Sequence, residues 1–143
     1  ANQTCRMLIK KLNSLWRQDM LKSIIDIPNE LLDGIYQTGS SVICNPPVTD
    51  TDIDYVIYTN EEDKLDTFLK CEGFRKSCVD EEEYDMESEG FTCYRKSNIN
   101  LIVTTNYNWY LKWVAATKLA KKLNLLQKEQ RITLFKYILY GEI

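Results

Sequence analysis

The sequence predicts a single domain of the α+β (mixed α/β) class, in which N-terminal and C-terminal helices flank a small mixed β-sheet. Three observations support this expectation. Apolar residues recur at helical spacing at both ends of the chain, β-rich runs lie between them, and no repeat or low-complexity linker divides residues 1–143. With 143 residues, of which 44% are apolar, the chain can bury one hydrophobic core.

The first half of the chain is expected to begin with helices and then enter the sheet. A first helix is indicated by apolar residues at helical spacing, namely Met7, Leu8, Leu12, Leu15 and Trp16. A short helix is expected over residues 28–32, closed by Gly34, and a short strand over residues 35–38. Asn45-Pro46-Pro47 predicts a stiff loop, and the β-rich residues 53–58 predict a central strand.

The second half is expected to complete the sheet and close with helices. A helix is expected over residues 61–71, because Asn60 can cap its first turn and Gly73 can end it. The remaining expected elements are strands over residues 74–79, 91–96 and 99–105, with a turn near Ser97-Asn98, and helices over residues 107–123 and 127–140.

The composition excludes several kinds of active site. The chain has no histidine, which rules out Ser-His-Asp and Cys-His nucleophile systems, Cys/His zinc sites and imidazole acid–base chemistry. Its five cysteines are an odd number without a C-x-x-C pair, which favours free thiols in a reducing compartment. No apolar run approaches the roughly 18 residues of a membrane span. We therefore expect a cytoplasmic protein that makes no use of a membrane.

The net charge of −3 is unevenly distributed along the chain. Residues 80–89 hold 7 of the 21 acidic residues and no basic one, so the remainder has 14 acids against 18 bases. We interpret this acidic run as a solvated loop, with mimicry of phosphate toward a partner protein as the alternative. Residues 112–136 carry seven bases and one acid, so an acidic protein can still present a basic surface to phosphate groups.

Two carboxylates at the start of the expected central strand are candidates for a metal site. Asp52 and Asp54 are two residues apart, so the alternation of a strand places both on one face of the sheet. Adjacent carboxylates repel each other and resist burial unless a cation joins them. Mg²⁺, held by one or two carboxylates and by substrate phosphates, suits this pattern.

A second candidate element precedes these carboxylates. Gly39-Ser40 follows a short strand and offers an unobstructed backbone N–H and a hydroxyl, which are the groups that a phosphate oxygen needs. The alternative for Ser40 is a simple turn hydroxyl. A phosphate-binding turn and a metal-binding pair joined by a stiff loop together indicate a site for a nucleoside triphosphate (NTP).

These residues resemble a known signature. Gly39-Ser40, followed after eleven residues by Asp52-Ile53-Asp54-Tyr55, resembles the pattern of the nucleotidyltransferase superfamily, which has the polymerase-β-like fold. The run Thr49-Asp50-Thr51-Asp52-Ile53-Asp54 also resembles that of the minimal nucleotidyltransferases. The resemblance extends loosely over residues 26–140, and the whole chain is most similar to small bacteriophage-encoded nucleotidyltransferase-like proteins, whose location is the host cytoplasm.

The resemblance implies a role for each matched residue. Gly39 and Ser40 would hold the triphosphate, and Asp52 and Asp54 would hold Mg²⁺ or Mn²⁺. The family usually has a third carboxylate on a neighbouring strand, where this sequence has Asn100, which carries no charge and cannot act as a base. Asp50 or an acid of residues 80–89 could substitute for it.

Other candidate residues have simpler alternatives. Lys118 and Lys121 could contact the triphosphate or a nucleic-acid acceptor, but a basic helix face of this kind is most often simply solvated. The aromatic residues at positions 107, 109, 110 and 113 could stack on a base, but their helical spacing favours core packing, and Tyr55 and Tyr58 are expected to pack on the sheet.

The leading hypothesis is a metal-dependent nucleotidyltransferase that moves a nucleotide from an NTP to a hydroxyl on RNA, protein or a small molecule and releases pyrophosphate. The alternative is a catalytically impaired protein of the same fold that binds nucleotide or a partner, as an antitoxin-like or phage host-interaction factor. A third hypothesis, a module that only binds nucleic acid through residues 112–136, is disfavoured by the acidic balance of the chain.

Overall fold

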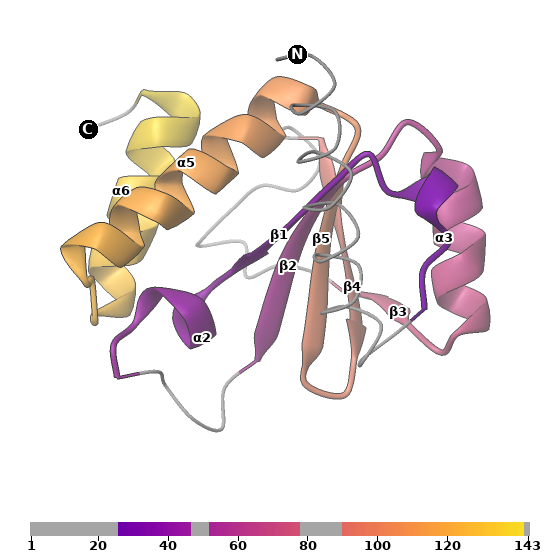
Figure 1. Cartoon of the computed structure of the whole chain (residues 1–143), viewed down its shortest axis with the longest axis horizontal. Coiled ribbons are helices and arrows are strands. Elements are labelled where there is room, and N and C mark those ends of the chain that lie inside the picture. The colour runs from indigo at the N-terminus through magenta and orange to yellow at the C-terminus, as the bar shows by residue number, and fades with distance from the viewer. Residues whose placement is uncertain (1–25, 47–51, 78–89, 142–143) are drawn as a thin grey trace, which may run out of the picture.

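The computed structural model describes residues 26–46, 52–77 and 90–141, which form a five-stranded mixed sheet with helices on both faces (Figure 1). The strands are β1 (Gly34–Thr38), β2 (Ile53–Tyr58), β3 (Arg75–Ser77), β4 (Phe91–Lys96) and β5 (Ile99–Thr104). The helices are the 3₁₀-helix η1 (Asn29–Leu31) and the α-helices α2 (Ser40–Ile43), α3 (Glu62–Cys71), α5 (Tyr107–Leu123) and α6 (Lys128–Tyr140). The α+β class expected from the sequence is therefore confirmed.

The centre of the sheet is a parallel pair of strands. The strand order is β1-β2-β5-β4-β3, in which β2 and β5 are parallel and every other neighbouring pair is antiparallel. A parallel pair needs a long crossover, and here α3, β3 and β4 lie between the two strands in the chain. The register aligns the first residues of β2 and β5, with Ile53 opposite Ile99 and Asp54 opposite Asn100.

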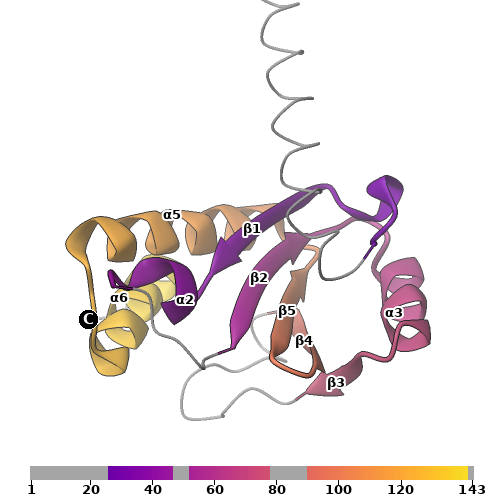
Figure 2. The same ribbon diagram turned by 60° about the horizontal axis from the view of Figure 1, so that its bottom comes forward.

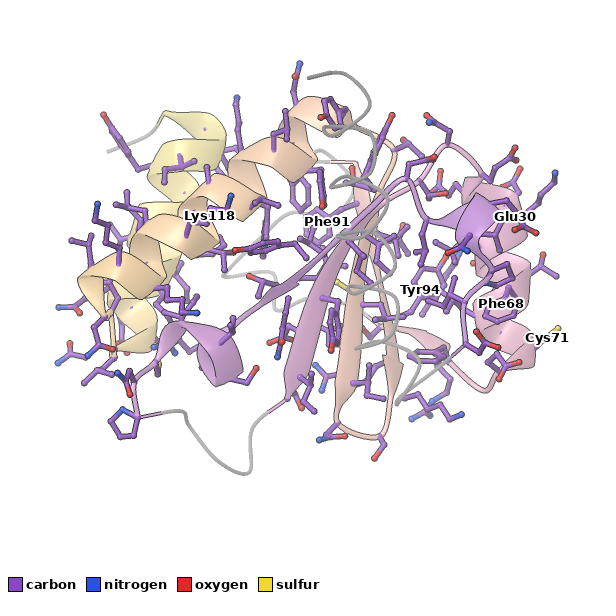
Figure 3. All side chains as sticks on the ribbon, in the orientation of Figure 1. Glu30, Phe68, Cys71, Phe91, Tyr94 and Lys118 are labelled. Carbon is purple, nitrogen blue, oxygen red and sulfur yellow. The ribbon has the colours of Figure 1, made fainter. Side chains whose placement is uncertain are left out.

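Each face of the sheet is covered by its own apolar cluster. On one face, Leu65 and Leu69 of α3 pack with sheet residues that include Tyr55, Ile57 and Leu101. Figure 3 shows Tyr94 and Phe68 on this side of the molecule. Because successive residues of a strand point to opposite faces, the alternating residues of β2 and β4 reach the other cluster.

The second cluster lies between the sheet and the helices α5 and α6, which pack together on the side opposite α3 (Figure 2). Trp109 stacks on Phe91 with ring centroids 4.9 Å apart, and Trp113 meets Phe135 edge-on at the same separation. The expected core role of Trp109, Tyr110 and Trp113 is confirmed, whereas Tyr107 is 53% exposed.

The elements expected within the described residues are present with shifted ends, and the short helix expected over residues 28–32 is the 3₁₀-helix η1. The helix over residues 61–71 begins at Glu62, and Asn60 does not cap it. The side-chain oxygen of Asn60 accepts from Tyr58 Oη at 3.1 Å, while its backbone N–H and side-chain amide donate to Asp33. Gly73 follows this helix with a φ of 93°, as expected, whereas Gly34 is the first residue of β1. The short helix α2 was not expected.

Some expectations lie outside the described residues. They are the first helix, the acidic run over residues 80–89 and residues 78 and 79 of the expected strand. Within the described residues, none of the helices has both the length and the apolar character that crossing a membrane requires.

Asp66 of α3 provides a pH-dependent link between that helix and the sheet. Tyr94 Oη donates to Asp66 Oδ1 at 2.6 Å, and Lys70 and Lys76 lie 3.0 and 3.4 Å from the same carboxylate. The Tyr94 hydrogen bond, followed by the two lysines, lowers the pKa of Asp66.

We therefore expect Asp66→Asn to destabilise the protein by about 1 kcal/mol at neutral pH. A lowered pKa in the folded state contributes stability that is present above the ordinary Asp pKa of about 4 and is lost as the pH falls through the folded value. Thermal unfolding at neutral and acidic pH measures the difference, which should shrink in acid. Asp63→Asn on the same helix is the control, and an equal effect of both changes would contradict the role of Tyr94.

Candidate functional site

One row of side chains crosses four strands of the sheet. The pairings place Thr38 of β1 opposite Asp54 of β2, Asp54 opposite Asn100 of β5, and Asn100 opposite Arg95 of β4. Directly paired residues point to the same face of a sheet, so these four side chains are neighbours. Asp52 precedes Asp54 by two residues, and its carboxylate reaches Arg95 on this face. The row lies on the face covered by α5 and α6, where Val56 and Cys93 continue the same alternation.

The turn after β1 lies directly against Asp54. Gly39 has a φ of 81° and a ψ of −179°, a backbone conformation that essentially only glycine adopts. A Cβ at this position would overlap Asp54 Oδ2. Gly39 and Asp54, fifteen positions apart in the sequence, are thus in contact. A larger residue at position 39 would force the turn and the carboxylate apart.

A buried hydrogen-bond network holds this turn in place. Thr38, immediately before Gly39, shares a 2.7 Å hydrogen bond with the hydroxyl of Thr117 on α5. Trp113 Nε1 also donates to Thr38 Oγ1 at 3.0 Å, and Thr117 Oγ1 donates to the Trp113 carbonyl at 2.9 Å. Since both threonines are 1% exposed, breaking the network would leave polar atoms without partners in the core.

The segment after Gly39 is tied to the same helix. Ser40 begins α2, and the carbonyl of Gly39 accepts from Val42 N and Ile43 N at 3.2 and 3.0 Å. At the end of α2, Asn45 and Asn124 exchange two hydrogen bonds between backbone and side chain, of 3.0 and 3.2 Å. Both ends of α2 are therefore positioned by α5.

The Asp54 carboxylate is largely buried, and this burial has the largest effect on its pKa. Burial raises the pKa of Asp54, and the charge of Asp52 raises it further. The Asn100 side chain, which donates Nδ2 to Asp54 Oδ1 at 3.1 Å, and the Arg95 charge oppose this effect. Asn100 Oδ1 is buried without a hydrogen-bond partner among the described residues.

Asp52 is half-exposed and is paired with a cation that the sequence reasoning missed. Arg95 Nη1 donates to Asp52 Oδ2 at 2.7 Å, and both side chains are 42% exposed. The two residues are 43 positions apart, and only the strand order β2-β5-β4 brings them together. The alternation of residues 91–96 could have predicted which face of the sheet Arg95 occupies. It could not have predicted that Asp52 is its partner.

The two candidate lysines lie on α5 beside β1 and not among the carboxylates. Lys118 Nζ lies over the ring of Tyr36, 5.7 Å from its centroid, and Figure 3 shows the side chain on α5. Lys118 comes directly after Thr117, whose hydroxyl is bonded to that of Thr38. Lys121 lies one helical turn beyond Thr117 and is exposed. Asp50 and residues 80–89 lie outside the described residues.

The groups that the structure brings together suit a hard cation by their chemistry. Two carboxylates and an amide with an unsatisfied oxygen are oxygen donors of the kind that Mg²⁺ and Mn²⁺ prefer. The raised pKa of Asp54 means that a nearby cation would relieve an existing electrostatic cost. Among the described residues, no group of three or more Cys, Asp or Glu side chains could hold a metal ion, so the set has two carboxylates and not three.

Comparison of the chain with protein-family models, with curated proteins and with solved structures gives no match.

We expect Gly39→Ala to destabilise the protein by about 3 kcal/mol, because the substitution adds backbone strain and overlaps Asp54. Gly141→Ala is the control, since Gly141 also has a positive φ (67°) but has no atom near its Cβ position, and it should cost about 1 kcal/mol. Urea unfolding measures both changes. The double variant Gly39→Ala/Asp54→Ala should be less destabilised than the sum of its single changes. Strict additivity would show that the overlap has no energetic weight.

Asp54→Asn should raise the midpoint of thermal unfolding by a few degrees at neutral pH. The folded-state pKa of Asp54 is raised, so the wild type loses stability as the pH rises from the ordinary Asp pKa of about 4, and the asparagine variant is spared this loss. The gain should vanish in acid, where Asp54 is protonated. Asp52→Asn, which removes the partner of Arg95, should give no such gain. A destabilised Asp54→Asn protein at neutral pH would contradict this account.

Proposed function

We propose that the chain is a divalent-cation-dependent nucleotidyltransferase of the polymerase-β-like superfamily, which transfers a nucleotide from an NTP to a hydroxyl acceptor on RNA, protein or a small molecule and releases pyrophosphate. The contact between the Gly39 turn and Asp54, beside Asn100 and on the same face as Asp52, is the observation that carries this proposal. It places a turn suited to phosphate beside a carboxylate suited to a cation.

Each candidate residue that the sequence analysis matched to phosphate or metal binding has a definite task under this proposal. Asp52 and Asp54 would hold Mg²⁺ or Mn²⁺, which when bound neutralises phosphate charge and polarises the reacting oxygens. The Gly39 backbone and the Ser40 hydroxyl would bind the triphosphate, with Lys118 and Lys121 adding positive charge beside β1. Catalysis would then consist mainly of positioning and charge neutralisation.

The residues around the carboxylates orient them. Asn100 fixes one oxygen of Asp54 through its amide N–H, and Arg95 fixes one oxygen of Asp52. The Thr38–Thr117–Trp113 network holds the turn that would bind phosphate. The binding groups are therefore held in place before any ligand arrives, which lowers the entropy lost on binding.

A second function is favoured by one observation. Asn100 occupies the position next to Asp54 on the neighbouring strand and donates a hydrogen bond to it, so it offers neither a negative charge nor a base. A protein that binds a nucleotide or a partner without transfer, antitoxin-like or interacting with a host factor, would need only Asp52 and Asp54.

We also propose a cytoplasmic location. Among the described residues, Cys44, Cys71 and Cys93 are free thiols, and free thiols are typical of a reducing compartment.

Calorimetric titration with non-hydrolysable analogues of each NTP, with and without Mg²⁺, tests the proposal. The wild type should bind one or more analogues in a Mg²⁺-dependent manner, and Asp52→Ala and Asp54→Ala should each weaken binding at least about tenfold, the effect of losing one charge-assisted contact. Asp63→Ala, a change of the same kind on α3, is the control.

Pyrophosphate release from hydrolysable NTPs separates the two candidate functions. Release that both aspartate substitutions abolish supports transfer, whereas Mg²⁺-dependent binding without release supports the second function. If no nucleotide binds the wild type, or if both variants bind as tightly as the wild type, the nucleotide site is disproved.

A further inference from the structure

Arg95 and Asp52 form an ion pair within the candidate site. Arg95 Nη1 donates to Asp52 Oδ2 at 2.7 Å, and each side chain is 42% exposed. The guanidinium reaches Asp52 from β4 across β5, where Asn100 lies opposite Arg95 and donates to Asp54. One of the two candidate metal ligands is therefore already paired with a cation from the protein itself.

The backbone of Arg95 is fixed, whereas its side chain is free to change partners. β4 lies between β3 and β5 and pairs with both, so Arg95 has Asn100 opposite it on one side and Arg75 on the other. The long side chain is partly exposed and has several rotatable bonds, so it can leave Asp52 without disturbing the sheet. A guanidinium that leaves Asp52 still remains within reach of a ligand bound there.

Arg95 and a divalent cation would compete for Asp52. Both are attracted to the same carboxylate, and they repel each other. With both carboxylates ionised, Asp52, Asp54 and Arg95 together carry a single net negative charge. A divalent cation alone would make this group positive, whereas a cation that arrives with a triphosphate would not. Arg95 should therefore oppose binding of the cation alone and favour binding of the cation together with a nucleotide.

We propose that Arg95 moves from Asp52 to a phosphate of the NTP when the cation and the nucleotide bind together. In the structure Arg95 is the counter-ion of Asp52, and with the NTP bound it is a phosphate-binding residue. This inference rests on the proposed function, because it adds a residue to the site that takes the NTP. It also makes cation binding depend on the nucleotide, and this dependence is reciprocal, since one coupling free energy acts on both ligands.

The chemistry of arginine suits this exchange. A guanidinium presents planar, paired donors that match a carboxylate and a phosphate alike, and it remains charged at any physiological pH. Mg²⁺ is commonly held by one or two carboxylates together with substrate phosphates, so a phosphate that shares a cation with Asp52 would come close to Arg95. A lysine would keep the attraction but lose the paired geometry, because its ammonium group is a point charge.

Binding of Mn²⁺, with and without non-hydrolysable analogues of ATP, GTP, CTP and UTP, tests this proposal. Electron paramagnetic resonance of free Mn²⁺ measures the affinity for the cation, and calorimetry in Mn²⁺ buffer measures the affinity for the analogue. Arg95→Gln should bind Mn²⁺ alone about threefold more tightly, because the ion pair no longer competes for Asp52. The same variant should bind the analogue about tenfold more weakly, because it loses one charge-assisted contact with phosphate.

Two further variants control for charge and for structure. Arg75→Gln makes the same change directly opposite Arg95 but one strand farther from Asp52, and it should leave both affinities unchanged. Arg95→Lys keeps the charge, so its affinity for Mn²⁺ alone should stay near that of the wild type, and it should recover part of the analogue binding. A merely structural role for Arg95 predicts losses in both measurements and not the opposite changes expected here.

The outcomes separate this inference from the proposed function. If the wild type binds an analogue, but Arg95→Gln binds it equally well or fails to bind Mn²⁺ alone more tightly, the exchange is wrong and the proposed function stands. If Arg75→Gln changes both affinities as much as Arg95→Gln does, the effect is one of general surface charge, and the exchange is again wrong. If the wild type binds no analogue in Mn²⁺ buffer, the proposed function fails and the exchange fails with it.

Discussion

The close approach of the Gly39 turn to Asp54 is the constraint on which the rest of the site depends. The turn has a conformation that excludes side chains, and it can lie against the carboxylate only because β1 and β2 pair with Thr38 opposite Asp54. The hydroxyl of Thr38 is bonded to Thr117 and Trp113 in the core. The position of the turn is therefore a consequence of how α5 packs on the sheet, and a change in that packing would reach the site directly.

Charged side chains distinguish this end of the sheet from the apolar clusters on its two faces. Burial disfavours the ionised form of Asp54 and raises its pKa. The negative charge of Asp52 is paired with the half-exposed Arg95. Beyond them, Arg95 and Arg75 are opposite each other at the edge. Burying one carboxylate beside another costs stability, and functional sites commonly carry such costs.

Asn100 connects the question of transfer with that of binding. It keeps one oxygen of Asp54 oriented while contributing no charge, so the site has two carboxylates, Asp52 and Asp54, where the family that the sequence resembles usually has three. Under the proposed function, the acceptor hydroxyl would lose its proton to another group or to water. Under the second function, the same amide would make a stable binding site without a base. The two functions share every described residue of the site and differ only in whether a bound nucleotide is transferred.

Local periodicity was sufficient to predict the α+β class, most strand and helix positions, and the presence of Asp52 and Asp54 on one face of the sheet. Gly39 could be identified as a candidate for phosphate binding because glycine lacks a Cβ in any context. The hydrogen bond between Arg95 and Asp52, and that between Thr38 and Thr117, 79 positions apart, could be found only from the folded arrangement of the elements. Such contacts depend on strand order and register, and a one-residue slip in register would turn each of these side chains to the opposite face.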